Sequence, residues 1–167
     1  PTSSSGYENV GTKPENATDG LLDTRWSSRF MDGEWLTIDL QNTYAVNRVK
    51  LYWETAYATH FDIQLSTDGV EYTTAYTATD AEGGTQDIIL PIGPTEARYV
   101  RIFCHQRNTG YGSSLYDAEV YGVRRPTALE NTYSEDNQLP HLILRNGQIY
   151  IMHKAKIYHI SGQLLQE

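Results

Sequence analysis

Short segments in which apolar and polar residues alternate follow one another from Trp35 onward. Such a two-residue period, rich in β-branched and aromatic residues, is typical of strands that are buried on one face. No apolar period of 3.6 residues persists for three turns, so helices are not expected. The pattern predicts an all-β fold, an antiparallel β-sandwich over residues 1–124. Its candidate strands are "EWLTIDL", "VNRVKLYW", "HFDIQLS", "YTTAYTA", "TQDIILP", "ARYVRIFC" and "LYDAEVYG".

The composition changes after residue 124. The stretch "RRPTALENTYSEDNQLP" is polar and has no period, so residues 125–140 are expected to form a linker. Residues 141–167 read as two or three short strands, with Asn146-Gly147 as a two-residue hairpin signal. We therefore expect a sandwich domain, a linker and a small C-terminal β-hairpin or meander, which would be marginally stable alone.

Length, composition and charge narrow the class of protein. The 167 residues suffice for one well-buried domain with a small appendage, and 39% hydrophobic residues with 13 Tyr argue against disorder. The net charge of −8 and the lack of a basic cluster beyond Arg124-Arg125 argue against nucleic acid as a partner. No apolar run approaches the roughly 18 residues of a membrane span, so no membrane insertion is expected. Cys104, the single cysteine, is expected to be a small buried hydrophobe.

The opening residues "PTSSSG" look like the end of a linker. The chain also starts without Met, which suggests a piece of a longer protein. We therefore expect an upstream catalytic or surface domain, together with any export signal, as a covalent partner.

The loop "NATDGLLDT" over residues 16–24 is a candidate cation site. Calcium takes six to eight oxygen ligands, and here Asp19 offers a carboxylate while Thr24 offers a hydroxyl and a carbonyl. Gly20 allows a sharp bend between them. The alternative is an Asx turn, in which Asp19 accepts hydrogen bonds from its own backbone. These residues alone leave both interpretations open.

Several separate motifs agree in order and spacing with one known family. The segments "NATDGLLDTRWSS", "EWLTIDL", "VKLYWETAYATHFDIQLSTDG" and "ARYVRIFCHQRNTGYGSSLYDAEVYG" resemble the discoidin, or factor V/VIII type C, domain, and within it the family 32 carbohydrate-binding modules. The resemblance covers nearly all of residues 7–122. It implies a jelly-roll sandwich of the galactose-binding type.

The resemblance also implies a structural calcium ion that joins the early loop to the last strand of the sandwich. A structural ion is closed in by its ligands, whereas a catalytic one keeps an open position. The matching ligands are the carbonyls of Asn16, Leu21 and Ala118, the carboxylates of Asp19 and Glu119, and the hydroxyl and carbonyl of Thr24.

A sugar site at the loop ends is the second implication, because "WETAYA" and "RNTGYG" resemble one subgroup of these modules. Its ligands include β-glucans and chitosan-type amino sugars, whereas other branches bind galactose or N-acetylgalactosamine, so the sugar stays open. Ser113 departs from the pattern, since relatives often carry a second aromatic residue there. Trp26, Trp35 and Trp53 are expected in the core. The candidate sugar contacts are Glu8, Arg25, Phe30, Glu54, Arg107 and Tyr111.

The resemblance thus implies non-catalytic carbohydrate binding that targets an attached glycoside hydrolase or surface protein to a glycan. Nothing resembles a nucleophile elbow, and no pair of carboxylates can be assigned as acid and base, so enzymatic activity is not expected. One alternative is a protein- or lipid-binding discoidin adhesion domain, although its apolar spikes are not expected at the polar tips "RFMDGE" and "NTGYGSS". The other alternative is a structural spacer.

The five histidines are scattered and show no zinc spacing, so most are expected at the surface. His105 is the exception, because it lies at the mouth of the last loop and is a further candidate for ligand contact. The tail "LILRNGQIYIMHKAKIYHISGQLLQ" resembles the sorting region of Bacteroidetes surface or secreted proteins, with an extra hairpin as the alternative. Both readings of the tail fit a secreted or cell-surface bacterial protein.

Overall fold

The computed structural model describes residues 1–124, 141–145, 148–153, 156–159 and 164–166. The chain divides into two compact units, Pro1–Arg125 and Pro126–Glu167. Among the described residues, no helix is long and apolar enough to cross a membrane.

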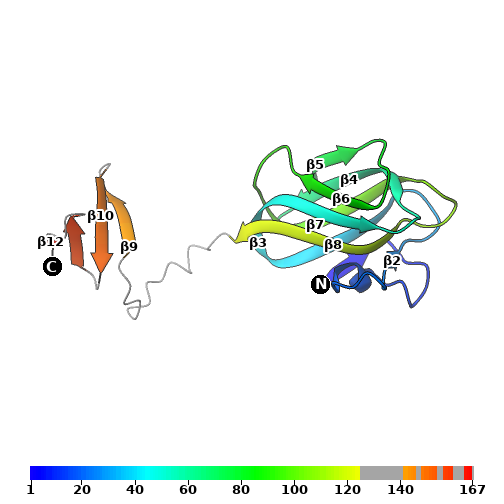
Figure 1. The fold of residues 1–167 in the computed structure, drawn as a ribbon, viewed down its shortest axis with the longest axis horizontal. Coiled ribbons are helices and arrows are strands. Elements are labelled where there is room, and N and C mark those ends of the chain that lie inside the picture. The colour runs from blue at the N-terminus through cyan, green and yellow to red at the C-terminus, as the bar shows by residue number, and fades with distance from the viewer. Residues whose placement is uncertain (125–140, 146–147, 154–155, 160–163, 167) are drawn as a thin grey trace. The chain divides into compact units, whose positions relative to one another are not determined.

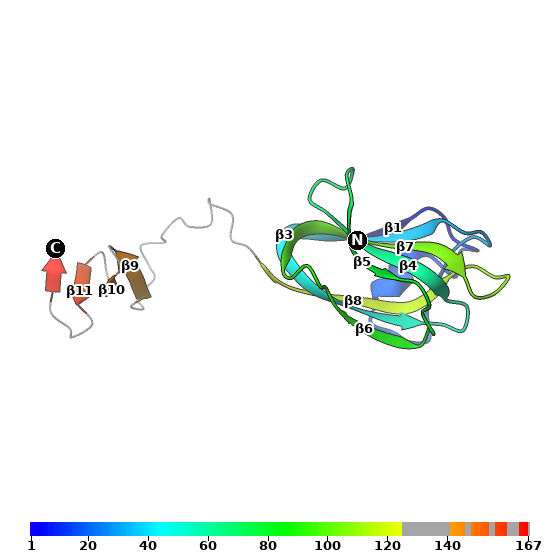
Figure 2. The same ribbon diagram turned by 90° about the horizontal axis from the view of Figure 1, so that it is seen from above.

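One long strand organises the first unit. β3 (Glu34–Trp53) is 20 residues long and joins two segments that the sequence predicted as separate strands. Its register against a neighbouring strand shifts between Asp39 and Tyr44, and Gln41 has a left-handed φ of 66°. The bend at these residues lets β3 contribute its first half to one layer and its second half to the other (Figure 2).

The strands form the two layers of the predicted antiparallel sandwich, which is confirmed. The first half of β3 pairs with β1 (Thr2–Ser4) and β7 (Thr95–Arg107), and the second half pairs with β6 (Thr85–Ile89) and β8 (Ser114–Arg124). Two further strands extend the β7 side, and a short one extends the β8 side. These are β4 (Ala58–Ser66), β5 (Thr73–Ala78) and β2 (Trp26–Ser27). A short 3-10 helix, η1 (Pro14–Thr18), contacts β8 (Figure 1).

The core fills the space between the layers with alternate residues of each strand. Trp26 and Trp53 are buried as predicted. Trp35 is not, because its neighbour Leu36 points into the core and directs the indole to the outer face. There the Arg101 guanidinium carbon lies 4.6 Å from the ring centre. The most deeply buried side chains include Leu51, Phe61, Ile63, Val100, Ile102, Cys104 and Leu115.

The N-terminal residues belong to the sandwich, contrary to the expectation of a linker. Thr2–Ser4 forms β1 against Leu36–Ile38, and the Asp39 N–H donates to the Pro1 carbonyl at 2.8 Å. β1 thus pairs with the edge of β3 that β7 leaves open, so the backbone groups along this edge are hydrogen-bonded. The polar composition of residues 1–6 did not reveal this strand.

The second unit is a small antiparallel sheet in the order β12-β11-β10-β9. It has four strands, where two or three were predicted. Arg145 pairs with Gln148, so two residues connect β9 and β10. The predicted linker over 125–140 and the hairpin turn at Asn146-Gly147 lie outside the described residues. The strands are β9 (His141–Arg145), β10 (Gln148–His153), β11 (Lys156–His159) and β12 (Leu164–Gln166).

Candidate functional site

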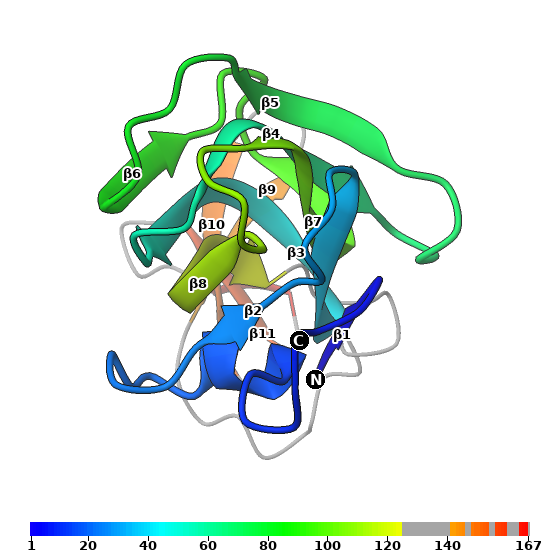
Figure 3. The same cartoon turned by 90° about the vertical axis from the view of Figure 1, so that its right-hand side faces the viewer.

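Three loops meet at one end of the sandwich, which Figure 3 views head on. They are the β2–β3 loop (28–33), the β3–β4 loop (54–57) and the β7–β8 loop (108–113), and we call them together the loop end. A Cβ on Gly112 would lie only 2.1 Å from the Ser28 carbonyl oxygen. Only glycine therefore permits the close contact between the first loop and the third.

Backbone hydrogen bonds join the loops to one another. The Ser28 N–H donates to the Ser113 carbonyl at 2.9 Å, and the Glu54 N–H donates to the Ser114 carbonyl at 3.0 Å. Ser113, the position that departs from the subgroup pattern, is 1% exposed, and its N–H donates to the Ser28 hydroxyl at 2.9 Å. Ser113 thus connects two loops from inside and offers no surface to a ligand.

Glu54 follows β3 directly and is partly exposed. Its carboxylate accepts hydrogen bonds from the Thr55 hydroxyl and, at 2.8 Å, from the Ala56 N–H. Partial burial works to raise the pKa of Glu54, but these hydrogen bonds and the positive charge of Arg25 outweigh it and lower the pKa. The loop end therefore carries a fixed negative charge at neutral pH.

Arg25 precedes the buried Trp26 and is itself half-buried. The side-chain amide of Asn16 donates to the Arg25 carbonyl at 3.1 Å, so the early loop holds this backbone in place. The Nε of Arg25 is buried and has no hydrogen-bond partner in the structure. Arg25 therefore has a fixed backbone and an Nε–H without a hydrogen-bond partner. Its positive charge is close enough to Glu54 to lower the pKa of that carboxyl.

Phe30 and Tyr111 form an exposed aromatic pair at the loop tips. Their side chains are 51% and 67% exposed, and the rings meet edge to face at 5.8 Å and 88°. Met31 beside them is 49% exposed. The tips, which were expected to be polar, therefore present an apolar surface.

Arg107 shapes the loops from within. Its Nε donates to the Asp32 carboxylate at 2.9 Å, and Nη1 donates to the Tyr111 carbonyl at 3.1 Å. The hydrogen bond from Arg107 lowers the pKa of Asp32, against a smaller raising effect of burial. The guanidinium thus links the two tips and places the aromatic ring of Tyr111. Its role as a direct sugar contact stays a prediction, beside the positioning role that these hydrogen bonds give it.

Glu8 lies near the β2–β3 loop. It is exposed, and its N–H donates to the Ser27 carbonyl at 2.9 Å. The Trp26 ring N–H donates to the Gly6 carbonyl at 3.2 Å, which fixes the same segment from the core side. Glu8 is therefore held beside the strand that leads into the loop end.

In the predicted calcium loop, the carboxylate of Asp19 accepts two hydrogen bonds. One carboxylate oxygen of Asp19 accepts from the Leu21 N–H at 2.9 Å, and the other accepts from the Thr24 hydroxyl at 2.8 Å. The first contact is the Asx turn, and the second brings two of the predicted ligand side chains together. The Asx turn is therefore observed, and calcium binding by this loop stays a prediction.

The last strand carries two carboxylates, Asp117 and Glu119, of which Glu119 is the predicted calcium ligand, a role that stays a prediction. Glu119 accepts hydrogen bonds from the hydroxyls of Tyr52, at 2.9 Å, and Tyr121. Asp117 is buried instead, and burial together with the negative charges of Glu119 and Asp19 raises its pKa, despite the opposing effect of backbone N–H groups. Asp117 is therefore the β8 carboxylate nearer the loop.

The strand pairing explains this difference. β2, which follows the calcium loop, pairs with the start of β8 at Leu115, so Asp117 lies closer to the loop than Glu119 does. Both acidic side chains lie on the same face of β8, and the sequence pattern alone could not choose between them. Ala118, whose carbonyl was a predicted ligand, is buried and paired with Leu51 in β3.

The comparisons with known proteins agree on a family. Residues 1–118 match the F5/8 type C domain. Chitosan-binding module 2 of a chitosanase/glucanase from Paenibacillus sp. IK-5, solved in complex with chitotriose, is 39% identical with a TM-score of 0.70, over 73% of this chain and 95% of that chain. Chitosan-binding module 1 of the same enzyme is 41% identical with a TM-score of 0.70, over 73% and 94%.

Two relatives from other enzymes are similar over the same region. The family 32 module of AlyQ, solved in complex with 4,5-unsaturated mannuronic acid, is 27% identical with a TM-score of 0.61, over 72% of this chain and 93% of that chain. The polysaccharide lyase 8 family protein HylA of Enterococcus faecalis is 29% identical over 123 residues, which are 70% of this chain and 9% of HylA. This chain belongs to the F5/8 type C domain family.

Proposed function

We propose that the first unit is a non-catalytic carbohydrate-binding module whose loop end binds the terminal sugars of a chitosan-type amino-sugar chain. The observation that carries this proposal is the exposed aromatic pair of Phe30 and Tyr111. The loops that hold this pair are hydrogen-bonded to each other, and the backbone after Tyr111 is hydrogen-bonded to the ionised Glu54. A sugar-binding surface needs both parts, an aromatic face for the apolar side of the pyranose ring and charged groups for its polar substituents.

The charge of the loop end favours an amino sugar. Glu54 accepts hydrogen bonds, and a protonated glucosamine amine is a donor with a positive charge, so the pair gains a charge-assisted hydrogen bond. The unused Nε–H of Arg25 lies near the same carboxylate and is available to a sugar oxygen after a small movement. Two modules at 39% and 41% identity are named as chitosan-binding, which supports the same ligand class for this chain.

The affinity expected for this site is modest. A shallow surface with a few hydrogen bonds gives dissociation constants from about millimolar to micromolar, or roughly −4 to −8 kcal/mol. A module of this kind becomes useful when it is linked to other binding units, since avidity multiplies weak contacts. We infer that it holds an attached glycoside hydrolase, lyase or surface domain on its glycan. HylA, in which the matching region is 9% of the protein, is an example of such a larger polysaccharide-active protein.

This role implies a secreted or cell-surface protein of a bacterium, because the polysaccharide lies outside the cell. The tail over residues 141–167 is consistent with a sorting region of the Bacteroidetes type, and this interpretation rests on the sequence resemblance alone. Export of a reporter fused to residues 125–167, compared with a reporter without them, would test it.

We further propose that calcium binds between the early loop and β8. The donor set is composed of hard oxygen atoms, which calcium prefers. Asp19 and Thr24 already lie together, Asn16 and Leu21 belong to the same loop, and Asp117 replaces Glu119 as the ligand from the strand. When bound, the ion neutralises carboxylates that otherwise repel one another. The loop residues themselves hold the Arg25 backbone through Asn16.

The ligand class is tested by native gel electrophoresis of the full chain in gels that contain soluble chitosan, β-1,3-glucan or galactan. We expect chitosan to retard the protein, and Phe30→Ala with Tyr111→Ala to abolish the retardation. Retardation by galactan alone would contradict the amino-sugar proposal. Binding to phosphatidylserine vesicles without retardation by any glycan would instead establish the lipid-binding alternative.

A further inference from the structure

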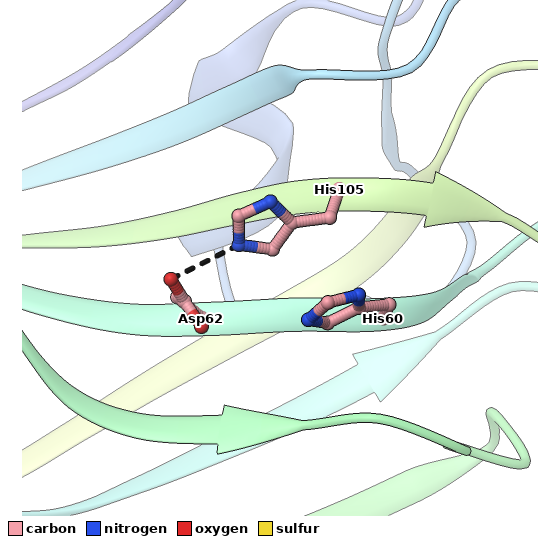
Figure 4. A group of neighbouring side chains, drawn as sticks. All are labelled: His60, Asp62 and His105. Atoms are coloured by element: carbon pink, nitrogen blue, oxygen red, sulfur yellow. Dashed lines mark ion pairs between the residues drawn. The ribbon is translucent and has the colours of Figure 1, made fainter.

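A second group of polar side chains gathers on strands away from the loop tips. His60, Asp62 and His105 each offer one ligand atom, and these atoms lie within 4.8 Å of one another. Figure 4 shows His60 and Asp62 on β4 and His105 on the neighbouring β7, with their side chains directed toward one another. The sequence shows no zinc spacing because these residues come from two strands that are adjacent only in the fold.

The strand register explains how the three side chains converge. His60 and Asp62 are two residues apart on β4, so they point to the same side, opposite to the buried Phe61. His60 pairs with Gln106 while Phe61 pairs with Cys104, which leaves His105 unpaired in a β-bulge. Alternation along β7 places His105 on the same side as Phe103, which pairs with Asp62, and the rings of Phe103 and His105 lie 4.8 Å apart.

Asp62 is the fixed member of the group. One carboxylate oxygen accepts from the Thr77 hydroxyl at 2.6 Å, and the other lies 3.0 Å from His105 Nε2. Burial works to raise the pKa of Asp62, but the hydrogen bonds from Thr77 and His105 outweigh it and lower the pKa. The Asp62 side chain is 11% exposed and is held from behind by Thr77, as metal-ligating carboxylates usually are.

The two histidine rings lie beside each other. The rings of His60 and His105 lie 4.5 Å apart at 35°. Around a tetrahedral ion with bonds of about 2.1 Å, ligand atoms are about 3.4 Å apart, so the His105–Asp62 distance of 3.0 Å must lengthen slightly when an ion binds. His60 is partly exposed, so a rotation of its side chain suffices to bring its nitrogen to the same spacing. An ordinary His–Asp ion pair would need only two of the three residues.

We propose that His60, Asp62 and His105 bind a divalent transition metal ion, with zinc as the best match to two imidazoles and one carboxylate. Three protein ligands leave the fourth position to water. The site is separate from the proposed calcium loop, whose donors are all oxygen. Zinc would join β4 to β7 across the bulge, the point at which their ladder is interrupted.

The test is calorimetric titration of zinc into the full chain, in excess calcium so that hard-oxygen sites are occupied. We expect one zinc ion to bind through this group, His60→Gln and His105→Gln each to weaken it about tenfold or more, and Thr77→Val to weaken it about 10- to 100-fold. His153→Gln in the second unit serves as the matched control and should leave this binding unchanged.

His60→Gln is the decisive variant because it preserves the His105–Asp62 pair. Circular dichroism would verify the fold of each variant. If zinc does not bind, or if it binds the His60→Gln protein as tightly as the parent chain, the group is an ion pair and the proposal is overturned.

Discussion

Glu54 offers the sharpest single perturbation of the loop end. The substitution Glu54→Gln keeps the size of the side chain and one oxygen for the Ala56 N–H, which now donates to the carboxylate at 2.8 Å. It removes the negative charge beside Arg25. The lowered pKa of Glu54 means that its charge stabilises the fold at neutral pH, so the melting temperature should fall slightly while sugar binding weakens.

The magnitude follows from the type of hydrogen bond lost. A hydrogen bond to a charged group contributes about 1.5 to 3 kcal/mol and a neutral one about 0.5 to 1.5 kcal/mol. Loss of the charge therefore costs about 1 to 1.5 kcal/mol, which is about 5- to 13-fold in the dissociation constant for chitotriose. Glu54→Ala removes the whole contact, so it should weaken binding about 10- to 150-fold, enough to abolish measurable heat for a weak ligand.

Calorimetric titration of chitotriose into each variant measures these changes. Glu71→Gln is the matched control, because Glu71 is an exposed glutamate in the β4–β5 turn at the opposite end of β4 from the β3–β4 loop. An affinity of Glu54→Gln within twofold of the parent chain, with the fold intact, would refute the assignment of this carboxylate to the sugar site.

Three other substitutions or treatments test separate parts of the structure. Gly112→Ala places a Cβ 2.1 Å from the Ser28 carbonyl oxygen, so we expect a loss of about 1 to 3 kcal/mol in the free energy of unfolding, measured by urea denaturation, and weaker sugar binding. Asp117 has a raised pKa in the folded state, so without calcium its favourable contribution is largest at low pH and is lost as the pH rises through the folded pKa. Asp117→Asn should therefore raise the melting temperature at pH 7 in the presence of chelator. It should also remove the increase in melting temperature that calcium gives the parent chain. If calcium raises the melting temperature of the variant as much as that of the parent chain, Asp117 is not a ligand. Burial raises the pKa of Cys104 to about 12, so this thiol should react with a thiol reagent at pH 8 only after unfolding; fast reaction of the native protein would contradict its position in the core.

The alternation of apolar and polar residues predicted most of the strands, because the two-residue period of a strand is a local property of the sequence. It identified the buried faces of β4 and β7 and the burial of Cys104. It did not reveal that β3 is one strand, since the bend at Gln41 depends on a left-handed backbone that the pattern does not encode. Trp35 was expected in the core as a large aromatic residue, although alternation in "EWLTIDL" groups it with Thr37 and Asp39, opposite to the buried Leu36 and Ile38.

In the candidate site too, some features could be predicted from the sequence and others depended on contacts between distant residues. Phe30, Glu54 and Tyr111 were predicted because they occupy loops between strands, and those loops meet in the sandwich. The contact of Arg107 with Asp32 joins residues far apart in sequence, so its positioning role was not foreseeable.

The spatial neighbours of acidic residues and histidines on strands were also hard to predict from the sequence. The choice between Asp117 and Glu119 depends on where β2 docks on β8. The convergence of His60 with His105 depends on the pairing of β4 with β7. Both are properties of strand pairing, for which one sequence gives no direct signal.

The most direct test of the central claim is a titration of chitotriose followed through the backbone amide signals of the protein by NMR. The account predicts saturable shifts concentrated in residues 28–33, 54–57 and 108–113, with little change in the β4–β5 turn around Glu71. Absence of saturable shifts, or shifts centred on the opposite end of the sandwich, would contradict it.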